Sequence, residues 1–250
     1  MSIKLSELTQ GPSHAKVLLL GPSGAGKTVA AATFPGKKLW LDFDNKISSA
    51  ANFYSQDKVM LESIEVKQYG KMSIKPATGK PRIAQFQEDM AVYFKMHDAK
   101  QKLPFDTLIL DTITTLSDSL LEDYRYVSQT GVKRPNVDQN SQSDYGLFAT
   151  HFKQIIGRLL ALECNVLFVG HTQMEQDEAT GLRTNEILMP GQLKAKLGIY
   201  FEEVYFAKIN QKGERVWQTQ ADGKTTFCRT QRRNMPIEIT ANYAEIVRVR

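Results

Sequence analysis

Long apolar runs, cysteines and low-complexity tracts are all scarce or missing in this 250-residue sequence. No apolar run approaches the roughly 20 residues that a membrane-spanning helix needs, so we expect no membrane partner. The opening segment, MSIKLSELTQ, has no apolar stretch of the secretory kind. Two cysteines, Cys164 and Cys228, are too few for a disulfide framework or a cysteine metal cluster. These absences favour a reducing cytoplasm as the compartment.

The composition is that of an ordinary globular protein. Hydrophobic residues make up 42% of the chain and charged residues 24%. A length of 250 residues fits one α/β domain with embellishments. The formal net charge of +5 permits a polyanionic partner but does not require one.

Apolar strand patterns alternate with helical patterns through most of the chain. Strands are predicted at 15–20, 38–43, 107–110 and 165–169, and helices at 27–34, 83–97, 115–126 and around 148–160. This alternation predicts a mainly parallel central sheet flanked by helices. Polar, turn-rich loops are expected at 65–82, 129–143 and 175–191, and a small hairpin insert is the alternative for 65–82. We treat residues 1–250 as a single domain.

The last part of the chain has a different pattern. Strands without intervening helices are predicted at 203–209, 215–218 and 225–229. We therefore place the core at 15–210 and a β-rich C-terminal extension at 211–250.

A glycine-rich motif follows the first predicted strand. Residues 21–28, GPSGAGKT, match G-x-x-x-x-G-K-[ST] in full, the phosphate-binding loop (P-loop). Its glycines let the backbone curl so that amide groups point at phosphate oxygens, and the following helix adds its positive N-terminal dipole. The motif predicts ATP and Mg²⁺ as ligands, with Lys27 on the β- and γ-phosphates and Thr28 on the metal. The residues expected around the nucleotide are Gly21, Pro22, Ser23, Gly24, Ala25, Gly26, Lys27, Thr28 and Val29.

An acidic residue ends the third predicted strand. The segment 105–112, FDTLILDT, is apolar up to Asp111, which is the form of a Walker B strand. Apolar strands also end at aspartate in plain turns, but a P-loop upstream favours Asp111 as a second residue at the magnesium ion.

Polar residues also follow the second and fourth predicted strands. Asp44, two residues after Asp42, is a candidate for orienting the attacking water; the alternative is that both acids only end the strand. His171 follows the fourth strand, where a polar side chain can meet the γ-phosphate; the alternative is a structural histidine. We expect Lys27, Asp44, Asp111 and His171 to form the catalytic set.

Three arginines cluster near the last predicted strand: Arg229, Arg232 and Arg233. One of them is a candidate arginine finger that reaches a neighbouring subunit's phosphates. A solvated basic surface is the alternative interpretation.

In this order, the motifs resemble the RecA-like recombinase core, and in particular the phage-type RecA-like ATP-binding proteins that serve in single-strand annealing. The resemblance extends over about 16–236 and implies a RecA-like P-loop NTPase fold. Asp44 stands where recombinases usually have glutamate, one methylene longer, which leaves its role as a base open. The resemblance also implies a phage-encoded protein in a bacterial host.

The resemblance further implies single-stranded DNA as a partner, bound by two loops at about 129–143 and 175–196. The candidate DNA-binding residues there are Lys133, Arg134, Arg183, Lys194 and Lys196. Cations of this kind neutralise backbone phosphates. Acidic residues in the second loop oppose that role, and ordinary surface loops are the alternative. Tyr145 is the nearest candidate for stacking on a base.

The function expected from these features is an ATPase, possibly stimulated by DNA, that promotes annealing or recombination. A homo-oligomer, either filament or ring, and a single-strand-binding protein are the expected protein partners. Two alternatives remain open: a P-loop kinase or phosphotransferase, and a nucleotide-dependent assembly module with little turnover.

Overall fold

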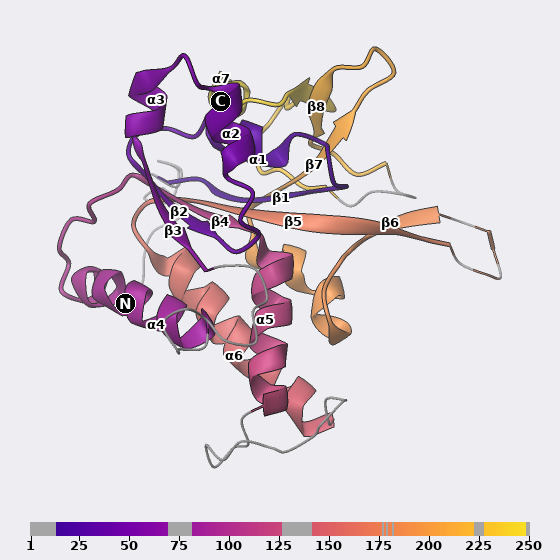
Figure 1. The fold of residues 1–250 in the computed structure, drawn as a ribbon. Helices are drawn as coiled ribbons and strands as arrows, with labels where there is room; N and C mark the ends of the chain where they lie inside the picture. Colours follow the sequence, from indigo (N-terminus) through magenta and orange to yellow (C-terminus); the bar gives the residue numbers. More distant parts are fainter. Residues whose placement is uncertain are drawn as a thin grey trace, which may run out of the picture.

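A mostly parallel sheet runs through the centre of the molecule (Figure 1). The computed structural model describes residues 14–69, 82–126, 142–176, 178, 180–181, 183–222 and 228–248. Within them the strand order is β3-β2-β4-β5-β1-β7-β8-β9, and β6 pairs with the far half of β5. The strands are β1 Lys16–Gly21, β2 Lys38–Asp42, β3 Ile64–Gln68, β4 Thr107–Asp111, β5 Asn165–Gln176, β6 Arg183–Ile187, β7 Glu203–Ile209, β8 Arg215–Gln218 and β9 Glu238–Thr240.

Helices cover both faces of this sheet. In Figure 1, α4, α5 and α6 lie on one side of it, and α1, α2, α3 and α7 lie on the other. The helices are α1 Lys27–Ala31, α2 Ser48–Phe53, α3 Lys58–Glu62, α4 Arg82–Asp98, α5 Ile113–Tyr126, α6 Gln142–Ala161 and α7 Tyr243–Arg248, with 3-10 turns η2 Gly191–Ala195 and η3 Leu197–Tyr200.

The core is split by the sheet into two hydrophobic clusters. Successive strand residues point to opposite faces, so Leu18 and Leu20 of β1 join the cluster beneath α4, α5 and α6. Val17 and Leu19 of the same strand join the cluster that contains Ala30 of α1. Both faces are buried, which explains why the parallel strands are apolar without alternation.

The carboxyl ends of four parallel strands meet at one edge. The register pairs Gly21 at the end of β1 with His171 of β5, and Asp42 at the end of β2 with Asp111 at the end of β4. Ligands of open α/β sheets bind at this edge. The fold therefore brings together strand-end residues that are far apart in the sequence.

The mixed α/β class and the mostly parallel sheet are confirmed. Two predicted loops were wrong in part. Residues 64–68 form edge strand β3, parallel to β2. Residues 172–176 continue β5 and pair antiparallel with β6, from Thr172 opposite Ile187 to Gln176 opposite Arg183. Both segments are strands because their backbones pair with a neighbouring strand, and a polar composition does not exclude such pairing.

Two strands of the predicted extension join the same sheet, and its last described residues form helix α7 instead of a strand. Strand β8 pairs antiparallel with β7, and β9 pairs antiparallel with β8. Residues 223–227, which contain most of the last predicted strand, fall outside the described residues. No helix in the described part of the chain has the length and apolarity needed to cross a bilayer.

Candidate nucleotide-binding site

The glycine-rich segment forms a tight turn between β1 and α1. Gly24 and Gly26 have φ angles of 81° and 83°, a left-handed conformation that side chains with a Cβ rarely adopt. The Ala30 amide donates to the Gly26 carbonyl at 2.9 Å, which starts the helix. The loop thus joins the first strand to a helix N-terminus, as phosphate binding requires.

Lys27 lies buried beneath this turn. Its ammonium donates to the carbonyls of Gly21 and Pro22, each at 2.8 Å, and lies 3.4 Å from Nδ1 of His171. Burial lowers the pKa of Lys27 to about 8, and the charges of Asp111 and Asp44 oppose that shift. The carbonyl bonds hold the cation beside the loop, within reach of an anion in the cavity.

Thr28 and Asp111 come together at the first turn of α1. The Thr28 hydroxyl donates to Oδ2 of Asp111 at 2.9 Å. Burial raises the pKa of Asp111 to about 7, against the effect of the Thr28 hydrogen bond. A hydroxyl and a carboxylate are hard oxygen donors of the type that Mg²⁺ prefers, and a divalent cation would favour the ionised carboxylate. The pair fits a magnesium ion.

Asp44 is the centre of a hydrogen-bond cluster. Its Oδ2 lies 3.1 Å from Nε2 of His171, and its Oδ1 accepts from the hydroxyls of Thr112, at 3.2 Å, and Thr115. Burial would raise the pKa of Asp44, but the hydrogen bonds from His171 and Thr115 and the charge of Lys46 hold it well below its usual range. Asp44 is therefore a fully ionised acceptor.

Asp42, the last residue of β2, and Asp44, two residues later, have different surroundings. The Asp42 carboxylate is buried and accepts the backbone amides of Lys46 and Ile47, each at 3.3 Å. Asp44, by contrast, lines the cavity. Asp42 therefore fits the alternative of an acid that only ends the strand, while Asp44 lies at the cavity where hydrolysis would occur.

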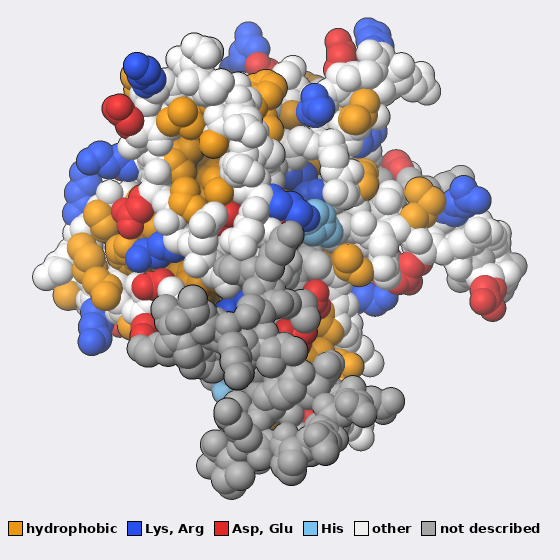
Figure 2. Space-filling view, in the orientation of Figure 1, with side chains coloured by type: hydrophobic (Ala, Val, Ile, Leu, Met, Phe, Trp, Pro, Cys, Tyr) orange, Lys and Arg blue, Asp and Glu red, His pale blue; other side chains and the backbone are white. Residues whose placement is uncertain are grey.

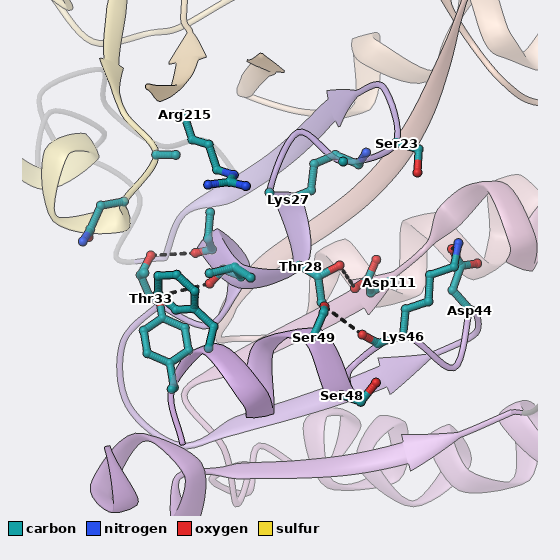
Figure 3. Close-up of a pocket in the computed structure, with 18 of the residues that line it drawn as sticks. Ser23, Lys27, Thr28, Thr33, Asp44, Lys46, Ser48, Ser49, Asp111 and Arg215 are labelled. Atoms are coloured by element: carbon teal, nitrogen blue, oxygen red, sulfur yellow. Dashed lines mark hydrogen bonds and ion pairs between the residues drawn. The ribbon is translucent and has the colours of Figure 1, made fainter. Parts of the chain in front are cut away.

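A cavity of about 790 Å³ joins these groups (Figure 3). Its phosphate end is lined by residues of the P-loop together with Asp44, Asp111 and His171. The rest of its lining includes the aromatic residues Phe53 and Tyr54 and the segments 213–215 and 240–242. That volume suffices for a nucleotide-sized ligand.

Arg215 is a lining residue that the sequence analysis missed. It begins β8 and points toward the P-loop in Figure 3. The sequence offers only a cation at the start of a predicted strand, with no local pattern that places it beside Gly26. Strand pairing across the sheet brings the two together.

The three candidate trans-acting arginines lie elsewhere. Arg229 exchanges backbone hydrogen bonds with Val204, at 2.8 and 3.0 Å, and Val204 in turn lies opposite Leu18 in the middle of β1. Nε of Arg232 is 3.5 Å from Glu203. Neither of these arginines, nor Arg233, lines the cavity of its own chain. Action on a neighbouring subunit stays a prediction.

The candidate DNA-binding cations are also dispersed. Lys194 forms ion pairs with Glu175, at 3.3 Å, and with Glu186. Arg183 and Lys196 are exposed, and Lys196 lines a hollow of about 280 Å³ with Tyr145. Lys133 and Arg134 fall outside the described residues. On the face drawn in Figure 2, basic side chains are scattered among acidic and apolar ones.

A mostly parallel α/β sheet with a strand–glycine loop–helix unit at its carboxyl edge defines the P-loop NTPase class of fold. A family model described as an AAA domain matches residues 13–229. The chain belongs to this AAA domain family, which makes it a P-loop ATPase by family. No curated protein sequence matches the chain.

Proposed function

We propose that this protein is a RecA-like ATPase that hydrolyses Mg²⁺-bound ATP, binds single-stranded DNA and promotes annealing or recombination in a phage-type system. The observation that carries the ATPase half of the proposal is the convergence of Lys27, Thr28, Asp111, Asp44 and His171 on one cavity at the carboxyl edge of the sheet.

The residues at the cavity have different proposed roles in hydrolysis. Lys27 and the amides of the P-loop bind the phosphates, and Thr28 with Asp111 holds the metal. Magnesium, when bound, neutralises charge that develops on the phosphate oxygens. A carboxylate with so low a pKa is a weak base, so Asp44 orients the attacking water and accepts its hydrogen bond, while His171 fixes the carboxylate at 3.1 Å.

His171 also connects the cavity to a hairpin outside the main sheet. Strand β5 pairs with β1 as far as His171 and with β6 from Thr172 onward. We call residues 172–176 and 183–187 the β5–β6 arm; in Figure 1 it extends away from the helical layers. A phosphate that displaced Lys27 from His171 would change the contacts of the residue from which the arm begins.

DNA binding is proposed for exposed cations that lie outside the nucleotide cavity. Arg183 on the arm and Lys196 beside Tyr145 are exposed cations suited to backbone phosphates. A filament or ring would follow if an arginine from 229–233 completed a neighbour's site, and a single-strand-binding protein is a further proposed partner.

ATP hydrolysis with and without single-stranded DNA tests both halves, with a Lys27→Ala variant as the inactive control. We expect DNA to stimulate turnover, and DNA retention to fall steeply as salt rises. Turnover without stimulation or retention would remove the DNA half. Tight ATP binding with negligible turnover would favour an assembly module, and phosphate transfer to a metabolite would favour a kinase.

A further inference from the structure

The backbone of Arg215 is held on both sides. A tight turn at 210–213 precedes it, in which the Asn210 side chain accepts the amides of Lys212 and Glu214 at 2.9 and 3.0 Å. On the other side, the Arg215 carbonyl accepts the Ala241 amide at 3.3 Å. The start of β8 therefore has a fixed position relative to the sheet.

The Arg215 side chain lies directly over the P-loop. A Cβ built on Gly26 would lie 2.5 Å from Cδ and 2.9 Å from Nε of Arg215, both closer than real atoms allow. The φ of 83° favours glycine at position 26, and the missing Cβ leaves the space that the Arg215 side chain occupies. Figure 3 shows the guanidinium directed toward the start of α1, beside Lys27.

Arg215 differs from the other cations that line the cavity. Lys27 donates to loop carbonyls and Lys46 pairs with Asp44 at 3.4 Å. Within the described residues, no acceptor hydrogen-bonds the Arg215 guanidinium and no carboxylate pairs with it. A guanidinium carries five N–H donors and does not lose its charge, so it offers the cavity a permanent cation with its donors available.

We propose that Arg215 binds the phosphate chain of the nucleotide in cis, so that one subunit supplies both Lys27 and an arginine to its own site. The inference rests on the proposed nucleotide binding. Closeness to Gly26 places Arg215 at the phosphate end of the cavity, because Gly26 belongs to the loop that is expected to bind the phosphates. Arginine matches phosphate oxygens through paired hydrogen bonds.

Calorimetric titration with Mg²⁺-ATP and with inorganic tripolyphosphate tests the contact without requiring turnover. We expect Arg215→Gln to weaken both ligands about 10- to 100-fold and Arg215→Lys to weaken them less. Lys212→Gln, which removes an exposed cation of the same hairpin, is the matched control and should bind like the wild type. Circular dichroism melting checks that each variant is folded.

The remaining outcomes are also decisive. Weaker ATP binding with unchanged tripolyphosphate binding would assign Arg215 to the nucleoside and overturn the phosphate contact. Unchanged affinity for both ligands would overturn the inference outright. A wild-type protein that binds ATP without turnover would sink the proposed hydrolysis but leave the Arg215 contact standing, and one that binds neither ligand would refute both.

Mixing two variants tests whether Arg215 acts within its own chain. A Lys27→Ala subunit keeps Arg215, and an Arg215→Gln subunit keeps the P-loop. If Arg215 acts in cis, the mixture hydrolyses ATP no faster than the two variants measured separately. Restored turnover would show that the arginine reaches a neighbour's site, contrary to the inference.

Discussion

The nucleotide cavity and the β5–β6 arm share one strand, yet they use charge in different ways. In the cavity, charged side chains from separate strand ends converge and point at a common space. Near the arm, Lys194 is already paired with Glu175 and Glu186. The comparison teaches that a cation's partners in the fold, rather than its presence in a basic segment, determine what it can bind.

The largest expected effect is the loss of nucleotide binding on Lys27→Ala. This substitution removes the buried ammonium beneath the P-loop, so we expect at least a 100-fold lower affinity for Mg²⁺-ATP. Fluorescent-nucleotide titration measures it. DNA affinity without nucleotide should be unchanged, and undiminished ATP binding would refute the site.

The next largest effect is expected for Asp44→Asn, which should lower the turnover rate and leave the affinity for ATP similar. The amide keeps the shape of the side chain but loses the charge that orients water, so we expect about a 100-fold lower kcat with similar ATP binding. Steady-state hydrolysis measures it. Lys46→Gln, which removes only the solvent-side partner of Asp44, should change kcat little; equal rates for wild type and Asp44→Asn would exclude Asp44 from the mechanism.

The pH dependence of ATP binding tests whether the charge of Lys27 in the cavity contributes to nucleotide affinity. The pKa of Lys27 is lowered to about 8, and a bound phosphate would favour the charged ammonium. At high pH the Lys27 amine is neutral in the free protein and must take up a proton when ATP binds. We therefore expect the ATP affinity to stay constant below pH 7 and to fall about tenfold between pH 7 and 9. Titration in EDTA isolates this effect from metal binding. The part of the slope due to Lys27 should vanish in Lys27→Ala, and an identical profile there would contradict the assignment.

The smallest effects are expected on the cations near the arm. Arg183 is exposed, so Arg183→Gln should weaken binding to single-stranded DNA about threefold and lower the salt slope by about 0.7. Lys194→Gln should change affinity less than twofold, because its ammonium is occupied by two carboxylates. Fluorescence anisotropy at several salt concentrations measures both. Equal losses would contradict the distinction between the paired Lys194 and the exposed Arg183.

Features that depend on residues adjacent in the sequence were predicted well. The P-loop, the strand ending at Asp111 and the alternation of strands with helices were all visible because each is encoded within a short stretch of chain. Edge strand β3 and the β5–β6 arm were not, since both depend on pairing with a strand whose position no local pattern reveals.

The sequence by itself determined a glycine turn, a lysine and a hydroxyl at a helix N-terminus, because φ angles and helix starts are set by adjacent residues. Only the tertiary structure decided that His171 would meet Asp44 across 127 residues and that Arg215 would lie against Gly26. Those contacts follow from the order and register of strands in the sheet, which arise from the packing of the whole chain.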